Sequence, residues 1–261
     1  MKGSGAGYIK NNASDRSSET DQEDRAMMEV LLSAEPATDV LDIQLVSLTI
    51  LAGIVTLIGL FLNNVAIVIG AMVISPLIVP IYAVTIFAVM GEYRKALNNL
   101  YVLVVLLILV IVTSALTTFV FDRIYDLSMT PEIMARMSNH EILILMAVAL
   151  GIALVISHTR GFPTMLIGIG ISIAIIPPVV VTGITIVMYQ QGMLSAILLM
   201  ANNILGLVAG SFIALLLLGI QPKWYRRKEH AKKMLLRILV LLVFLLAGVT
   251  VVTVIVSHNL L

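Results

Sequence analysis

The sequence predicts an all-α protein, a polytopic membrane helix bundle of about seven spans. Of its 261 residues, 60% are hydrophobic and only 12% are charged, a balance that differs strongly from that of an average soluble domain. The chain also divides into apolar runs close to the roughly 20 residues that a membrane-spanning helix needs. Two of these runs carry prolines at their centres, which predicts broken helices.

Polar and apolar stretches alternate along the chain and set the expected organisation. Residues 1–44 are polar and should form a largely disordered cytoplasmic leader. A first three-span unit at 45–121 and a second at 142–220 should be joined by an external polar connection at 122–141. Residues 221–261 should form a basic cytoplasmic loop and a seventh span. The expected spans are 45–62, 65–90, 97–121, 142–157, 165–188, 194–220 and 235–256.

The prolines lie in the second and fifth expected spans. A proline inside a helix lacks an N–H group and clashes with the carbonyl four residues earlier, so Pro76 and Pro80 should free the carbonyls of Met72 and Pro76. Pro177 and Pro178 should interrupt the fifth span in the same way. In hydrocarbon, an unpaired carbonyl costs several kcal/mol unless protein or water satisfies it. We therefore expect breaks at 75–80 and 176–178 that approach each other near the middle of the membrane.

The two proline-containing spans also resemble each other. With an offset of 98 residues, Ile69, Gly70 and Pro80 align with Ile167, Gly168 and Pro178. With the N-terminus inside, the second span should run from outside to inside and the fifth from inside to outside. Two such units predict an inverted repeat, a pattern typical of transporters.

The candidate solute pathway consists of the prolines and the polar residues near them. Buried Asn side chains need partners for their amides, so Asn202 and Asn203 are expected either to bond the freed carbonyls or to clamp two helices together. No span interior contains an ionisable side chain, which favours a small cation or a neutral polar solute over a large anion. The pathway candidates are Ser75, Pro76, Pro80, Thr85, Pro177, Pro178, Thr182, Asn202 and Asn203.

Small residues at four-residue spacing indicate close helix packing. We expect such packing at Gly70, Gly168, Gly206 and Gly210. Ordinary packing within the chain is favoured over a gate or an oligomer contact, although a homo-oligomer is left open. Ser114, Thr117 and Thr118 share one face of the third span, and their hydroxyls are expected to bond carbonyls of their own helix.

The positive charges predict the orientation. Of the 16 Lys and Arg residues, all but Arg123 and Arg136 fall on one side if seven spans start inside, and cytoplasmic loops are enriched in these residues. The N-terminus should therefore be cytoplasmic and the C-terminus outside. Basic residues next to the seventh span are candidates for contact with anionic membrane lipids. They are Arg226, Arg227, Lys228, Lys232 and Lys233.

Several function classes have no support in the sequence. The chain has no Cys and a net charge of +1, so a thiol-based site and a nucleic-acid partner are not expected. It contains no HExxH, GxSxG or P-loop motif. We expect no enzymatic activity, no cofactor and no metal site.

The stretch 69–80, IGAMVISPLIVP, is followed by Gly91-Glu92 and a basic loop, and 168–178 with Asn202, Asn203 and Gly210 forms a second signature. These motifs resemble the prokaryotic membrane family known as domain of unknown function 389 (DUF389). The resemblance covers roughly residues 40–220. It implies a multi-pass protein of a prokaryotic inner membrane but supplies no substrate and no site residues.

Two hypotheses on function remain. The first is a transporter or channel for a small ion or polar solute, with its pathway at the two proline-broken helices. The second is a membrane scaffold or sensor that does not transport and that uses the basic loop at 223–233 to bind lipid or a partner.

Overall fold

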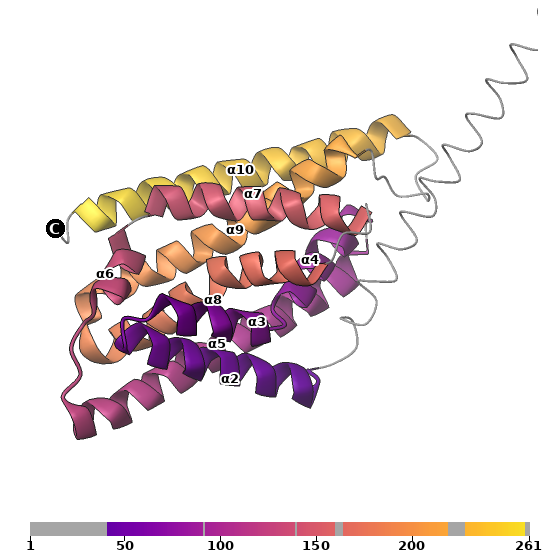
Figure 1. Ribbon diagram of the computed structural model, residues 1–261. Coiled ribbons are helices and arrows are strands. Elements are labelled where there is room, and N and C mark those ends of the chain that lie inside the picture. The colour runs from indigo at the N-terminus through magenta and orange to yellow at the C-terminus, as the bar shows by residue number, and fades with distance from the viewer. Residues whose placement is uncertain (1–40, 91, 139, 160–163, 219–227, 259–261) are drawn as a thin grey trace, which may run out of the picture.

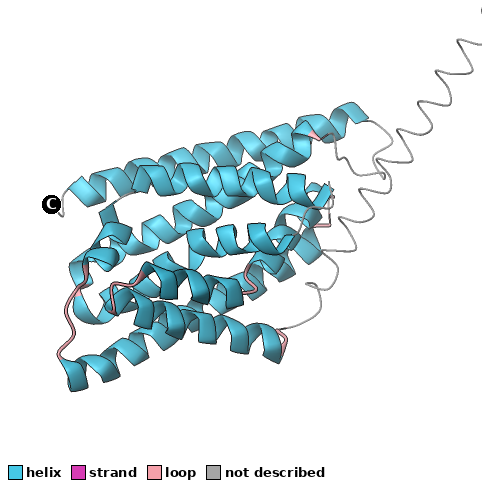
Figure 2. Cartoon of the chain, viewed as in Figure 1, coloured by secondary structure: helices cyan, strands magenta, loops and turns pink. Residues whose placement is uncertain are grey.

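The computed structural model describes residues 41–90, 92–138, 140–159, 164–218 and 228–258. Within those ranges, the surroundings of side chains are described except at 78, 138, 140–142, 157–159, 164–173, 228–235 and 257–258. Every regular element in this part of the chain is a helix (Figure 2). The helices are α2 (Ile43–Phe61), α3 (Val65–Ile74), α4 (Ile78–Val89), α5 (Tyr93–Tyr125), α6 (Pro131–Ser138), α7 (His140–Thr159), α8 (Thr164–Met188), η2 (Gln190–Gly192), α9 (Met193–Leu217) and α10 (Lys228–His258).

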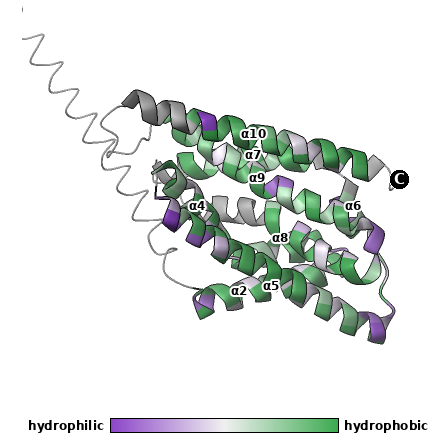
Figure 3. Cartoon of the chain, turned by 180° about the vertical axis from the view of Figure 1, so that it is seen from behind, coloured by the Kyte–Doolittle hydropathy of each residue, from purple (hydrophilic) through white to green (hydrophobic). Residues whose placement is uncertain are grey.

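Several of these helices can span a membrane. Four described helical stretches have the required length and hydropathy: α2, α5, Gln190–Leu217 in η2 and α9, and Leu236–Val256 in α10. The pair α3 and α4 gives a fifth if it is counted as one span. Shorter apolar stretches occupy Leu143–Ile156 in α7 and Ala174–Met188 in α8. Hydrophobic residues predominate along the coloured parts of α5 and α10 (Figure 3), which is consistent with a helical membrane protein.

The short helix α6 marks one end of the bundle (Figure 1), which we call the α6 end. The Thr130 hydroxyl, just before α6, donates to the Leu60 carbonyl at the end of α2 over 2.7 Å. The Ser195 hydroxyl, in the first turn of α9, donates to the Met137 carbonyl in α6 over 3.4 Å. Helices α2, α5 and α8 therefore end at the α6 end, whereas α3, α7 and α9 begin there.

The turn between α2 and α3 has a local explanation. Asn63 adopts a left-handed conformation with φ 50°, which Asn tolerates better than most residues. The Asn64 side chain then accepts hydrogen bonds from the N–H groups of Ala66 and Ile67 at 3.0 and 3.3 Å. This N-cap pairs two of the four backbone donors that the start of α3 leaves unpaired.

The segment 65–90 forms two helices rather than one. Helix α3 ends at Ile74, Ser75 is extended with ψ 124°, and α4 begins at Ile78. The axes of Val65–Ile74 and Val79–Val89 differ in direction by 54°. A residue before proline is pushed out of the helical conformation, which places the interruption directly before Pro76.

Pro80 contributes differently from the sequence-based expectation. It is the third residue of α4, and N–H groups in the first turn of a helix have no partner within that helix. Pro80 therefore removes no helical hydrogen bond. The Pro76 carbonyl, which we expected to be free, accepts from the Val79 N–H group at 3.2 Å. The interruption is confined to 75–77.

The second expected break is absent. Helix α8 runs from Thr164 to Met188 with Pro177 and Pro178 inside it. The prediction of a helix interruption at 176–178 is therefore wrong. The reason lies in a hydrogen bond from a neighbouring helix, which is described with the site below.

Close contact between α7 and α9 depends on glycine. A Cβ atom on Gly210 would overlap the Val148 carbonyl oxygen, and one on Gly151 would overlap the Leu207 carbonyl oxygen. The Ser211 hydroxyl donates to the Gly151 carbonyl over 3.1 Å. The two backbones approach each other more closely than any residue with a side chain would allow at these positions.

Candidate functional site

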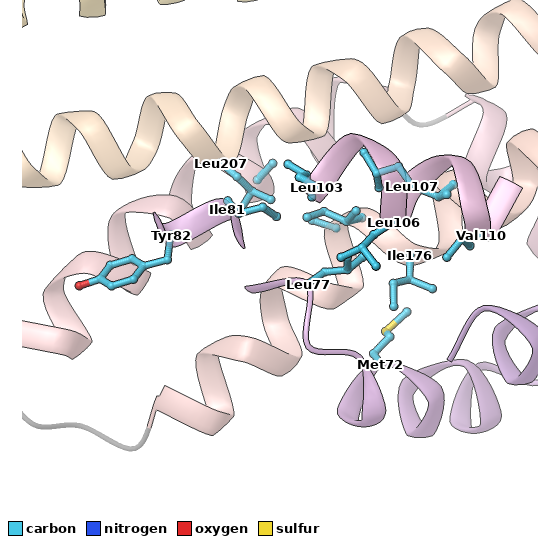
Figure 4. Close-up of a cluster of buried hydrophobic side chains, with 14 of the residues drawn as sticks. Met72, Leu77, Ile81, Tyr82, Leu103, Leu106, Leu107, Val110, Ile176 and Leu207 are labelled. Atoms are coloured by element: carbon cyan, nitrogen blue, oxygen red, sulfur yellow. The ribbon is translucent and has the colours of Figure 1, made fainter. Parts of the chain in front are cut away.

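The α3–α4 interruption lies between two helices that pack against α8. Helices α3 and α4 both contact α8. Met72 before the interruption, Leu77 within it and Ile176 beside the α8 prolines are buried in one apolar cluster (Figure 4). Leu207 of α9 and Leu106 of α5 belong to the same cluster. The two proline segments thus pack against the same buried apolar cluster, although only the first interrupts its helix.

Asn203 replaces the hydrogen bond that Pro178 removes from α8. Pro178 has no N–H group for the carbonyl of Ala174, four residues earlier. The Asn203 side-chain Nδ2 group in α9 donates to that carbonyl over 2.7 Å. Asn203 is fully buried, so this bond replaces the missing backbone donor inside an apolar environment. Of the two roles expected for the Asn pair, Asn203 has that of bonding a carbonyl freed by proline.

The other amide atom of Asn203 is not paired. Its Oδ1 atom is buried and has no hydrogen-bond partner among the described residues. A buried acceptor without a partner costs about 1–3 kcal/mol. Asn203 therefore presents an available acceptor beside the α8 prolines.

Asn202 has the other expected role and joins two helices, α9 and α10, by hydrogen bonds. Its Nδ2 group donates to the Thr253 hydroxyl of α10 over 2.8 Å, and its Oδ1 atom accepts from the Thr250 hydroxyl over 3.3 Å. Both Asn202 and Thr253 are fully buried. Thr250 and Thr253 were not among the expected site residues; their three-residue spacing, which places both on one face of α10, is the signal that could have identified them.

The hydroxyls near the prolines mostly bond their own helices. Thr85 donates to the Ile81 carbonyl over 3.1 Å, and Thr182 donates to the Pro178 carbonyl over 2.8 Å. The Ser75 Oγ atom accepts from the Leu77 N–H group at 3.4 Å and so supports the non-helical turn. All three residues are buried, and Ser75 lies directly at the interruption.

The predicted packing glycines separate into three cases. A Cβ atom on Gly206 would lie 3.1 Å from the Ala147 Cβ atom, and Gly210 meets the α7 backbone, so both pack within the chain as expected. Gly70 is exposed, and a Cβ atom there would meet nothing within 4 Å. The prediction of close intrachain packing at Gly70 is therefore wrong. The surroundings of Gly168 lie outside the described residues.

Part of the expected lipid-binding segment also lies outside the described residues. This holds for Arg226 and Arg227, and for the side chains of Lys228, Lys232 and Lys233. The backbone at 228–233 belongs to α10, which corrects the expectation of a loop up to 233. Among the described residues, no group of three or more His, Cys, Asp or Glu side chains is arranged to hold a metal ion.

Comparison with known proteins identifies the family. Residues 72–209 match the family described as Domain of unknown function (DUF389), a region that includes the interruption, the α8 prolines and both Asn residues. The chain belongs to the DUF389 family. An uncharacterized protein of Methanocaldococcus jannaschii is 29% identical to it over 203 residues. No solved structure matches the chain.

The archaeal DUF389 relative is longer than the aligned region. The alignment covers 77% of this chain and 62% of the relative, so the chain spans about three-fifths of that protein's length. The family match and the helical fold agree with the resemblance that the 69–80 and 168–178 motifs indicated.

Proposed function

We propose that this DUF389 protein is an integral membrane transport protein for a small cation or a neutral polar solute. Its path passes the α3–α4 interruption and the proline segment of α8. The observation that carries the proposal is the non-helical backbone at 75–77 within an apolar helix bundle, where Ser75 and Leu77 are buried and Pro76 is half-buried. At membrane depth, such backbone is tolerated only inside protein or beside a water-filled cavity.

The polar groups near this backbone support recognition without charge. Asn203 offers an unpaired Oδ1 acceptor among the described residues, and Ser75 places a hydroxyl at the interruption. Oxygen atoms of this kind replace the hydration shell of a small cation or accept hydrogen bonds from a neutral solute. A large anion would require a positive partner, and the Lys and Arg residues lie near the ends of the spans or in the connections between them.

An inverted repeat is part of the proposal. In this scheme α2, the α3–α4 pair and α5 correspond to α7, α8 and α9. The contacts α2–α5 and α4–α5 then have counterparts in α7–α9 and α8–α9, and the contact α5–α8 has its counterpart in α9–α4. Helices α2 and α5 end at the α6 end, whereas α7 and α9 begin there, as opposite orientations of the two units require.

The same proposal includes seven spans in a prokaryotic inner membrane, with the N-terminus cytoplasmic and the C-terminus outside. The bent pair α3–α4 counts as one span, and α7 and α8 cross as complete helices of 20 and 25 residues. The distribution of Lys and Arg supports the orientation. Reporter domains fused after Leu261 and inserted within 223–233 should report opposite sides of the membrane, and the same side for both would contradict the topology.

The test of transport is a flux assay with purified protein in sealed liposomes. We expect the protein to raise the flux of at least one member of a panel of Li⁺, Na⁺, K⁺, urea and glycerol above that of empty liposomes. The combined variant Ser75→Leu and Asn203→Leu should lower this flux, because both changes place apolar bulk on the path. A matched control, Leu145→Ala, alters a side chain that is 72% exposed on α7 and should leave it unchanged.

Correctly inserted protein that raises none of these fluxes would contradict the proposal. So would full flux through the combined Ser75 and Asn203 variant. Insertion is checked separately by protease protection of the reporter fusions, so a failure of folding is not mistaken for a failure of transport.

A further inference from the structure

Three buried hydroxyls in the bundle have no hydrogen-bond partner among the described residues. They are Thr56 in α2 and Ser114 and Thr118 in α5, each with at most 1% of its surface exposed. We expected Ser114 and Thr118 to bond carbonyls of their own helix, and that prediction is wrong. Thr113, next to Ser114, does form such bonds, to the carbonyls of Leu109 and Val110 at 2.7 and 3.1 Å. The unpaired hydroxyls are therefore a local feature of this position and not a general property of α5.

Thr56 and Ser114 lie at nearly the same depth. A Cβ atom on Gly53 would lie 3.0 Å from the Val110 Cγ1 atom, which fixes the register of α2 against α5. Both helices run towards the α6 end. Thr56 is three residues beyond Gly53, and Ser114 is four beyond Val110, so their depths differ by only about 1.5 Å at 1.5 Å of rise per residue.

Helix α8 completes the surroundings at that depth. A Cβ atom on Gly183 would lie 2.7 Å from both the Ser114 Cβ atom and the Ile111 carbonyl oxygen. Helices α2, α5 and α8 contact one another in all three pairs. The missing side chain at Gly183 thus brings the α8 backbone next to Ser114.

We propose that Thr56 and Ser114, with Thr118 one turn nearer the α6 end, form a binding site for a dehydrated small monovalent cation between α2, α5 and α8. Hydroxyl and carbonyl oxygens are the ligands that hard cations prefer. The Ile111 carbonyl oxygen has two lone pairs, and only one of them accepts the hydrogen bond within α5, so the other can contact an ion. The carboxylate that these helices contain, Asp122 of α5, lies eight residues beyond Ser114, about 12 Å along the helix. Because sites for Ca²⁺ rely on carboxylates, the charge of a monovalent ion fits the site better.

This site lies beyond the α8 proline segment. Gly183 is five residues beyond Pro178 and nine beyond Ala174 on α8, distances of about 7.5 and 14 Å along the helix. Binding at Thr56 and Ser114 can therefore be measured at equilibrium, without any assumption about transport past Asn203.

The test measures thermal unfolding of the purified full chain in detergent, with Li⁺, Na⁺ or K⁺ replacing N-methylglucamine at constant ionic strength. A ligand that binds only the folded state raises the unfolding temperature in a concentration-dependent way. We expect one of the three ions to give this rise in the wild type. Thr56→Val and Ser114→Ala should lose it, whereas Thr56→Ser, which keeps a hydroxyl, should retain it.

Thr113→Val is the matched control, since its hydroxyl bonds its own helix, and it should keep the ion-dependent rise. Without the ion, Thr56→Val should unfold at a temperature no lower than the wild type, because it removes an unpaired buried polar group. That result excludes a folding defect as the cause of the lost rise.

The absence of an ion-dependent rise with all three ions would overturn the inference. An unchanged rise in both Thr56→Val and Ser114→Ala would also overturn it, since the ion would then bind elsewhere. Cation binding in a protein that shows no flux would support this site while contradicting the proposed transport function.

Discussion

Replacing Gly210 by Ala tests the packing of α9, which carries Asn202 and Asn203, against α7. The new Cβ atom would overlap the Val148 carbonyl oxygen of α7. Because that atom belongs to the backbone, a side-chain rotation cannot relieve the overlap, and α7 and α9 must move apart. Overpacking of this kind costs about 1–3 kcal/mol, and we expect the upper half of that range here.

Part of this cost is offset. Ala is better than Gly in a helix by about 1 kcal/mol, so the net loss in the free energy of unfolding should be about 1–2 kcal/mol. Gly70→Ala is the matched control, because its Cβ atom would meet nothing within 4 Å. It should gain up to about 1 kcal/mol from the same propensity difference. The two variants should therefore differ by about 2–3 kcal/mol, in opposite directions from the wild type.

The assay is reversible unfolding in mixed detergent micelles, followed by far-ultraviolet circular dichroism. Equal stability of Gly210→Ala and Gly70→Ala would refute the reasoning, because it would mean that the α7 and α9 backbones are not in contact at Gly210. A second readout is the spacing of α7 and α9, measured by paired spin labels, which should increase only in Gly210→Ala.

Two further substitutions test the Asn pair. Asn203→Leu leaves the Ala174 carbonyl unpaired and should lower the free energy of unfolding by about 1–3 kcal/mol. Adding Pro178→Ala restores a backbone N–H donor for that carbonyl and should recover part of the loss. Strictly additive effects of the two changes would count against the hydrogen bond. A double-mutant cycle of Asn202→Leu and Thr253→Val should give a coupling energy of about 0.6–1.7 kcal/mol, the range for hydrogen bonds between membrane helices, and zero coupling would argue against the clamp.

The membrane class and the first helix interruption follow from local sequence features. Apolar runs of suitable length identify helices that can cross a membrane. Pro76 lies in the interior of its apolar run and forces Ser75 out of the helical conformation, as the residue before proline generally requires. The positions of the loops at 62–64 and 189–192 follow from Asn, Gln and Gly between apolar runs in the same way.

The second proline segment could not be predicted by the same rule. The effect of Pro178 depends on whether another helix supplies a donor to the Ala174 carbonyl, and Asn203 does so at 2.7 Å. That bond requires α9 to fold back along α8 in one register, which is a property of the tertiary structure. The position of Pro80 within the first turn of α4 likewise became clear only once the start of α4 was known.

The glycines illustrate the same limit. Gly70 and Gly210 both have small residues four positions away, yet Gly210 lies against a carbonyl of α7 and Gly70 faces outwards. Four-residue spacing of small residues shows that one face of a helix lacks large side chains, but it does not show whether another helix packs against that face. The unpaired hydroxyls of Thr56 and Ser114 were also invisible, since Ser and Thr in apolar helices usually bond their own backbone.

The accessibility of Ser75 to water tests the proposed path most directly. The chain has no Cys, so a single Ser75→Cys substitution can be probed with a charged, membrane-impermeant thiol reagent without background. Controls are Ala83→Cys, which is fully buried in α4, Tyr125→Cys, which is 70% exposed at the α6 end, and Gly70→Cys on the exposed face of α3.

The proposal predicts that the reagent modifies Cys at position 75 and at 125 but not at position 83. It also predicts no reaction at position 70, because that face lies in lipid, from which a charged reagent is excluded. An unmodified Cys at position 75 in protein that reacts fully at position 125 would contradict a water-accessible path at the α3–α4 interruption.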